Sequence, residues 1–105
     1  MARFDVYRHA GPGSADTPYL IDVQADLLDG LDTRVVVPLR RRDRLAVPSV
    51  PPDLMPVFDV EGVACVLETP KLAAVPLRLL KTRVCALAEH RARITGALDF
   101  LFQGY

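Results

Sequence analysis

Histidines are the side chains of this sequence best suited to proton transfer, and its two histidines lie far apart along the chain. His9 begins a turn-rich segment, and His90 lies on the outer face of an expected helix. An imidazole titrates near neutral pH and serves as a general base in many active sites. A lone histidine is more often an exposed side chain than a catalytic base, so we expect neither to be catalytic.

Asp22 and Asp26 are four residues apart and are the carboxylates to compare with a metal site. They lie in an expected strand and just after it, an arrangement that does not hold two carboxylates on one ion. The sequence also lacks a glycine-rich phosphate loop and a nucleophile elbow. We therefore predict no catalytic residues, no metal site and no cofactor.

Cys65 and Cys85 form no CxxC pair and have no nearby set of histidines and cysteines that would bind zinc. Both lie in short apolar stretches, ACV and VCA. Isolated cysteines in such surroundings are typical of buried free thiols in a reducing compartment. We expect a cytoplasmic protein.

The charges balance overall, with 13 basic and 13 acidic residues, so no global field attracts the chain to nucleic acid or to a membrane. Locally they separate. Five aspartates and no basic residue lie between Asp16 and Asp32, whereas four arginines surround Asp43 between Arg40 and Arg44. The arginine run is suited to phosphate, but no aromatic residues interleave it for base stacking, which favours a solvated loop.

Short strands fill most of the chain. We expect them around Phe4 and Val6, at Tyr19–Ala25, at Arg34–Leu39, at Val57–Val60 and Val63–Leu67 around a Glu61-Gly62 turn, and near Pro76 within Leu72–Leu80. Pro38 has no amide hydrogen to donate, so it favours an edge strand or a strand end. The basic, proline-bearing segment Arg40–Pro52 is expected to hold no stable element.

The last stretch, Ala86–Tyr105, predicts an amphipathic helix. Apolar residues recur at spacings near three and four, namely Val84, Leu87, Ile94, Leu98 and Leu101, with Ala97 and Phe100 widening the stripe. Gly104 ends the helix, and the tip beyond it is expected to be exposed. Thr82 is one possible cap, so the start of this helix stays open.

These elements predict an α+β fold, a curved antiparallel sheet forming a small half-open barrel with one C-terminal α-helix. At 105 residues we expect a single domain, 1–105. The start of the chain has no apolar leader segment, and no apolar run approaches the ~20 residues that span a bilayer. We therefore expect no membrane association.

Several segments, in order, resemble the CcdB family of plasmid and chromosomal toxins. They are Phe4–Tyr7, Asp22–Asp29, Arg34–Leu39, Pro56-Val57, Ala74–Pro76 and the final helix up to Phe102-Gln103-Gly104-Tyr105. Only the loop after the first strand and the segment Arg40–Pro52 look unlike the family. The family's barrel-like sheet and C-terminal helix agree with the elements expected above. The resemblance also favours a helix start near Ala88.

The resemblance implies a toxin that is not an enzyme and that takes part in plasmid maintenance. Family members form homodimers whose paired helix tips enter the DNA gyrase A subunit dimer and trap gyrase on cleaved DNA. A CcdA-like antitoxin, encoded alongside, neutralises the toxin. The implied partners are therefore gyrase A, the antitoxin and a second copy of the chain, with no direct binding of nucleic acid by the toxin alone.

Matched residue by residue, the gyrase-contacting positions fall on Gln103, Gly104, Tyr105, Asp99, Leu27 and Leu28. At least one of the two leucines is expected in the core, and so is Phe102. The family's best-known poisons have tryptophan at the position of Gln103, and its ring stacks on a gyrase arginine. Glutamine has no such ring, so we expect Tyr105 to supply an aromatic contact instead.

Two alternatives remain. A diverged CcdB-like protein can bind the antitoxin without poisoning gyrase, and Gln103 is the feature that favours it. The Kid and MazF endoribonucleases share the fold, but they need a convergent set of arginine, aspartate or histidine on the sheet face. We find no such set at matching positions.

Overall fold

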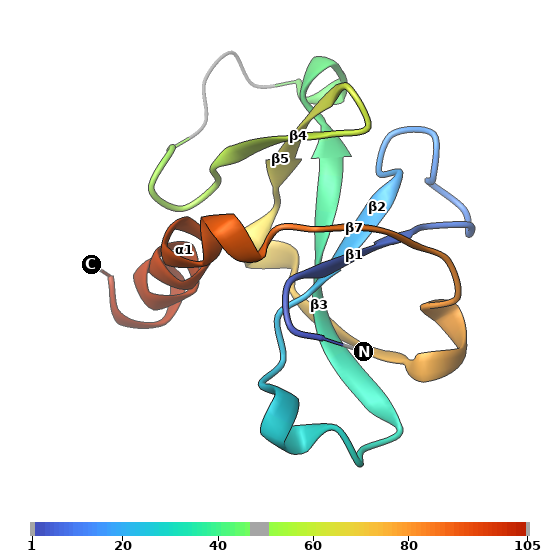
Figure 1. Ribbon diagram of the computed structural model, residues 1–105. Helices are drawn as coiled ribbons and strands as arrows, with labels where there is room; N and C mark the ends of the chain where they lie inside the picture. Colours follow the sequence, from blue (N-terminus) through green and yellow to red (C-terminus); the bar gives the residue numbers. More distant parts are fainter. Residues whose placement is uncertain (1, 47–50, 105) are drawn as a thin grey trace.

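A curled antiparallel sheet and one C-terminal helix make up the protein (Figure 1). The computed structural model describes residues 2–46 and 51–104. Its strands are β1 (Asp5–Arg8), β2 (Tyr19–Asp22), β3 (Thr33–Arg41), β4 (Val57–Val60), β5 (Val63–Leu67), β6 (Ala73–Pro76) and β7 (Arg83–Ala86), and its helix is α1 (Arg91–Gln103). The strand order is β4-β5-β3-β2-β1-β7, with β6 also paired to β3. This half-barrel confirms the predicted α+β fold.

The long strand β3 changes partners along its length. Its first half pairs with β6 and its end pairs with β5, while β2 runs along its other side. Pro38 lies between the two halves, so the prediction of an edge or strand end for this residue was wrong. Its carbonyl faces the side where the partners change and accepts from the Glu68 amide at 3.0 Å. No amide hydrogen is needed on that side at the changeover, which explains why proline is tolerated there.

The hairpin of β4 and β5 confirms the turn predicted at Glu61-Gly62, with Val60 paired to Val63. Both turn residues have positive φ, 54° at Glu61 and 80° at Gly62. Such angles belong to the turn that matches the twist of paired strands.

The last helix is shorter than its apolar spacing predicted. Val84 and Ala86 lie in β7, a strand that the prediction missed, and a single 3-10 turn, Ala88–His90, precedes α1. Thr82 therefore caps no helix, and helical structure begins at Ala88. Val84 in β7 and Ile94 in α1 both face the same core. The apolar spacing therefore continues from the strand into the helix, and it does not show where the strand ends and the helix begins.

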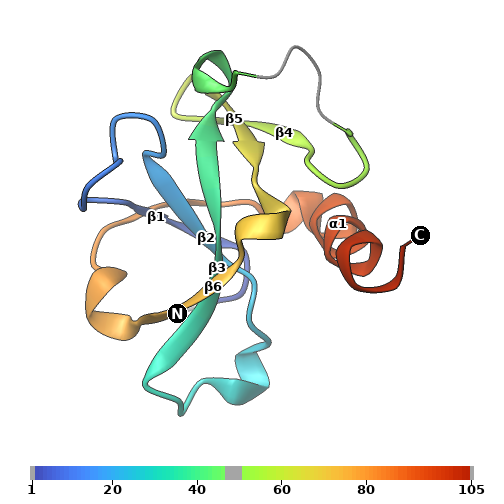
Figure 2. The ribbon, with the colours of Figure 1, turned by 180° about the vertical axis from the view of Figure 1, so that it is seen from behind.

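The two faces of the sheet are covered differently. On one face α1 closes a large apolar core that includes Val6, Ile21, Val37 and Leu67 and that Ile94 and Ala97 complete. On the other face a small cluster lies under the segment 77–82, with Tyr7, Leu20, Val36 and Leu80 as its buried members. Figure 2 shows this segment and α1 on opposite sides of the sheet. No helix within the described ranges has the length and hydropathy that a membrane crossing requires.

Candidate functional site

The end of α1 projects away from the sheet (Figures 1 and 2). Gly104 follows the helix with φ 81°, and its amide donates to the Phe100 carbonyl at 2.9 Å. Glycine adopts this left-handed conformation without a steric cost, so the predicted helix end is confirmed. Asp99, Gln103 and Gly104 are all exposed here. Tyr105 lies outside the described residues.

Phe102 was expected in the core, and that expectation was wrong, because its side chain is 71 % exposed. The buried residues of α1 are Ala97 and Ile94, about one and two turns earlier. The last turn of α1 projects beyond the sheet (Figure 1). Helical spacing alone does not show where a helix leaves its support. An exposed aromatic ring thus stands next to Gln103.

Leu27 and Leu28 lie on a separate projection, the 3-10 turn Asp26–Leu28. They are 97 % and 50 % exposed, so the expectation that at least one belongs to the core was also wrong. Figures 1 and 2 place this turn below the sheet and well apart from the end of α1. Within one protomer, the predicted site residues therefore form two surfaces rather than one.

A buried ion pair supports the turn that carries the leucines. The Arg34 guanidinium donates to Asp22 Oδ2 at 2.6 and 2.9 Å, and both side chains are fully buried. Arg34 also reaches Asp29 on the far side of the turn at 3.2 Å. Burial raises the pKa of the Asp22 carboxyl, against the opposing effect of its hydrogen bonds from Arg34 and the Gln24 amide. Asp22 is thus a structural acid bound to an arginine, and not a metal ligand.

The Gln24 side chain also stabilises the turn Asp26–Leu28 through hydrogen bonds. Its side-chain amide donates to the Leu28 carbonyl at 3.2 Å, and its Oε1 accepts from the Val35 amide at 3.0 Å. This polar cluster was not predicted from the sequence. The available signal was an acidic stretch without basic residues, followed by Arg34 at the start of an otherwise apolar strand.

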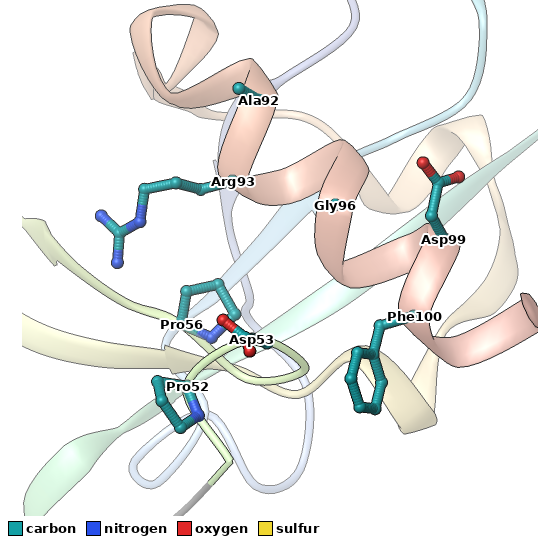
Figure 3. A pocket seen from close by; sticks show the side chains of 8 residues that line it. All are labelled: Pro52, Asp53, Pro56, Ala92, Arg93, Gly96, Asp99 and Phe100. Carbon is teal, nitrogen blue, oxygen red and sulfur yellow. The ribbon is translucent and has the colours of Figure 1, made fainter. Parts of the chain in front are cut away.

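A cavity of about 490 Å³ runs along one side of α1. It is lined by Pro52, Asp53, Pro56, Ala92, Arg93, Gly96, Asp99 and Phe100. Figure 3 shows α1 beside the segment that carries the two prolines, with the Phe100 ring on the side of the helix where that segment lies. Arg93 is already engaged, because it donates to the Val57 carbonyl and lies over the Phe58 ring. The carboxylates in the lining of this cavity are Asp53 and Asp99, and the other described lining residues apart from Arg93 are uncharged.

Neither histidine lies in a catalytic arrangement. His9 Nδ1 donates to the Thr17 carbonyl at 2.7 Å, and His90 packs its ring 5.1 Å from that of Phe58. Both are half-buried, and His90 precedes α1 instead of lying on its outer face. Across residues 2–46 and 51–104, no three histidine, cysteine, aspartate or glutamate side chains cluster so as to hold a metal ion.

The cysteines are free thiols, with Cys65 fully buried and Cys85 half-buried. Burial raises the pKa of Cys65 to about 11 and raises that of Cys85 above its ordinary value. A thiol that stays protonated at neutral pH is a poor nucleophile. These side chains contribute to packing rather than to chemistry.

The basic segment is more ordered than expected. Arg40 and Arg41 belong to β3 and pair with β5, and Arg42–Arg44 form a 3-10 turn, so the prediction of no stable element was wrong in this part. Arg41 binds Asp43 at 2.9 Å, and Asp16 lies 3.8 and 3.7 Å from the guanidinium nitrogens of Arg40 and Arg44. These arginines already form ion pairs with aspartates, so phosphate would have to displace the carboxylates in order to bind here.

Comparison with protein families gives one match that spans nearly the whole chain. The model of the family described as CcdB protein covers residues 3–104. This range contains both exposed projections and every strand of the sheet. The resemblance seen in the separate motifs is thereby confirmed.

Proposed function

Because the chain belongs to the CcdB family of toxin–antitoxin toxins, we propose that it binds the DNA gyrase A subunit through the end of α1 and traps gyrase on cleaved DNA. A CcdA-like antitoxin neutralises it. The family's toxins poison gyrase and are not enzymes, and we extend both properties to this chain. The whole chain, 1–105, acts as one domain in the cytoplasm.

The observation that carries this proposal is the exposed end of α1. Phe102 is 71 % exposed, and Gln103 and Gly104 beside it are exposed as well. A large apolar side chain at a projecting helix end costs solubility unless a partner covers it. Aromatic residues are also the usual energetic centres of protein interfaces. The position of these residues suits insertion into a cavity of another protein.

In this mechanism the toxin acts by selective binding. It binds the conformation of gyrase that holds cleaved DNA more tightly than the others, and so it shifts the population toward that conformation. Gyrase A is itself a dimer, so a two-fold toxin dimer engages it with two helix ends at once. Since Leu27 and the end of α1 are apart in one protomer, we propose that the two protomers together assemble the contact surface.

Gln103 lowers the expected affinity. Loss of a tryptophan ring at this position removes a cation–π interaction of about 0.5–2 kcal/mol at each helix end. For the two helix ends of a dimer, this loss raises the dissociation constant for gyrase by one or more orders of magnitude. We propose that Phe102 and Tyr105 supply aromatic surface on either side of Gln103 and recover part of this loss.

A gyrase cleavage assay tests the proposal. Purified protein incubated with gyrase, supercoiled plasmid and ATP is expected to yield linear DNA after denaturation and proteolysis. Phe102→Ala is expected to reduce the yield by about tenfold or more, and Gln103→Trp to increase it. Asp59→Ala is the control, because Asp59 is exposed in β4 and belongs to neither projection. Sedimentation of each variant shows whether the dimer persists.

No linear DNA from the parent protein, with Gln103→Trp restoring it, would instead establish a diverged relative that binds antitoxin without poisoning gyrase. Gln103 is the observation that favours this second candidate. Tyr105→Ala tests the contribution of the last residue, and unchanged gyrase inhibition would remove Tyr105 from the site.

The ribonuclease alternative gains nothing from the sheet face. Its most obvious arginine–aspartate pair, Arg34 with Asp22, is fully buried and so out of reach of RNA. Incubation of the protein with RNA is expected to leave the RNA intact.

A further inference from the structure

Leu27 is the most exposed large apolar side chain among the residues that the structure describes, at 97 %. Its turn, Asp26–Leu28, has no buried residue, so packing against the core does not fix the conformation of this segment. A single 3-10 turn has too few backbone hydrogen bonds to be rigid by itself. Polar side chains therefore have to hold it, and the bond from Gln24 to the Leu28 carbonyl is one such contact.

Asp26, the first residue of the turn, is bound from two sides. Its Oδ1 accepts from the Arg3 backbone amide at 2.8 Å and lies 3.5 Å from an Arg34 guanidinium nitrogen. Arg34 is itself fixed in the interior by its ion pair with Asp22, and it also binds Asp29 just past the turn at 3.2 Å. The Asp26 carboxylate thus joins the turn to one rigid side chain and to one backbone amide.

The turn Ala2–Asp5 brings the Arg3 amide to Asp26. Phe4 in this turn has φ 74°, a left-handed conformation that bulky residues rarely adopt because of its steric cost. Backbone strain of this kind is retained where a function requires one particular geometry. The Phe4 amide also donates to the Asp22 carbonyl at 2.7 Å, which attaches the strained turn to the end of β2. A hydrogen-bond donor for Asp26 is thereby kept in place.

We propose that Asp26 is a positioning residue for gyrase binding, whose carboxylate holds the turn Asp26–Leu28 in the conformation that presents Leu27. This inference rests on the gyrase contact proposed above, because Leu27 belongs to that contact surface. Asp26 acts through Leu27 and needs no contact of its own with gyrase. A turn that is already ordered binds without first losing conformational freedom, so loss of the carboxylate lowers the affinity.

The test measures the affinity of the purified protein for the purified gyrase A subunit by isothermal titration calorimetry. Asp26→Ala is expected to weaken binding by about fivefold or more. Asp26→Asn keeps an oxygen that accepts from the Arg3 amide, and it is expected to bind at least about twice as tightly as Asp26→Ala. Thermal melts check that both variants are folded, which is expected because the Asp26 side chain is 60 % exposed.

Asp32→Ala is the matched control. Asp32 belongs to the same acidic stretch and is exposed, but its carboxylate forms no ion pair within residues 2–46 and 51–104. The variant removes the same charge from the same part of the surface and is expected to change the affinity by less than about twofold. Equal weakening by Asp32→Ala and Asp26→Ala would show that gyrase responds to negative charge alone, which overturns the proposal.

A double-mutant cycle with Leu27→Ala distinguishes positioning from direct contact. If Asp26 acts through Leu27, Asp26→Ala has little left to disturb once the leucine is gone. It is then expected to weaken the binding of Leu27→Ala by less than about twofold. Losses that multiply in the double variant would mean that Asp26 contributes independently of Leu27, and the proposed role would be wrong.

Amide hydrogen exchange tests the same role in the free protein. The Leu28 amide donates to the Ala25 carbonyl at 3.0 Å, and the Asp29 amide donates to the Asp26 carbonyl at 3.1 Å. Asp26→Ala is expected to speed the exchange of these two amides by about threefold or more and to leave the amides of β4 unchanged. Unchanged exchange in the turn contradicts the inference.

The calorimetry also separates this inference from the function on which it rests. Absence of binding between the parent protein and gyrase A overturns the proposed function, and the inference with it. Binding of the parent protein with equal binding of Asp26→Ala overturns the inference alone.

Discussion

The two faces of the sheet bury their residues by different means. The face under α1 is closed mainly by apolar side chains, among them Val6, Ile21, Val37 and Ile94, each without solvent exposure. The opposite face combines a small apolar cluster, the Arg34–Asp22 ion pair and an open cavity of about 550 Å³. One face thus provides most of the stability. The other has a smaller apolar core and buries a pair of charged side chains.

The largest expected effect comes from breaking the ion pair on the opposite face. Arg34→Met leaves the Asp22 carboxylate buried without its partner, and we expect a loss of about 3–5 kcal/mol in the free energy of unfolding. Urea denaturation measures it. The double variant Arg34→Met/Asp22→Leu is expected to recover much of the loss, because it removes the second charge as well. If the double variant is as unstable as the single one, burial of charge is not the cause.

A direct comparison of the faces uses one core residue from each. Ile94→Ala removes fully enclosed apolar groups beneath α1 and is expected to cost about 2–5 kcal/mol of unfolding free energy. Leu80→Ala on the opposite face is expected to cost about 2 kcal/mol or less, since a neighbouring cavity already limits the contacts of that side chain. Equal losses would show that the two cores are packed alike.

At the end of α1 we expect a substitution to affect partner binding but not the stability of the fold. Phe102→Ala is expected to change the free energy of unfolding by no more than about 0.5 kcal/mol, because the ring is mostly in solvent. Denaturation midpoints at several protein concentrations check this, since a dimer held together by Phe102 would make the midpoint of the parent protein depend on concentration.

The smallest effect concerns Glu61, which lies in the turn of the β4–β5 hairpin. The Tyr19 hydroxyl at 2.6 Å and the Arg8 guanidinium lower the pKa of Glu61 below its ordinary 4.5. The Glu61 carboxylate accepts these hydrogen bonds only in the folded protein, so its ionised form stabilises the folded state relative to the unfolded chain. Its stabilisation is complete above about pH 4.5 and is lost as the pH falls through the lowered value. Glu61→Gln is expected to flatten the pH dependence of the unfolding midpoint in this acidic range.

Local signals explain which parts of the fold were predictable. The hairpin at Glu61-Gly62 was recognisable because turn chemistry acts between neighbours in the sequence. The pairing of Arg34 with Asp22 joins two strands, and β7 owes its existence to pairing with β1 from the other end of the chain. Neither is encoded in a local pattern, so both were missed.

The residues of the candidate site come from the family resemblance, whereas their exposure could not be predicted. The resemblance indicated Gln103, Gly104 and Leu27, but the family position of Phe102 and the apolar character of the leucines suggested burial for Phe102 and for one leucine. Burial depends on where an element projects beyond its neighbours, and the end of α1 and the turn Asp26–Leu28 both do so. Single-residue hydropathy contains no information on that placement.

The pairing of β1 with β7 also constrains how the protein is made. Val6 pairs with Cys85, so an early segment of the nascent chain has to wait for a late one before the sheet is complete. Closure of such a long loop is slow compared with local pairing. The end of α1 is synthesised later still. During translation the chain on the ribosome therefore has an incomplete sheet until its last segments emerge, and premature termination is expected to release a fragment that cannot close the sheet.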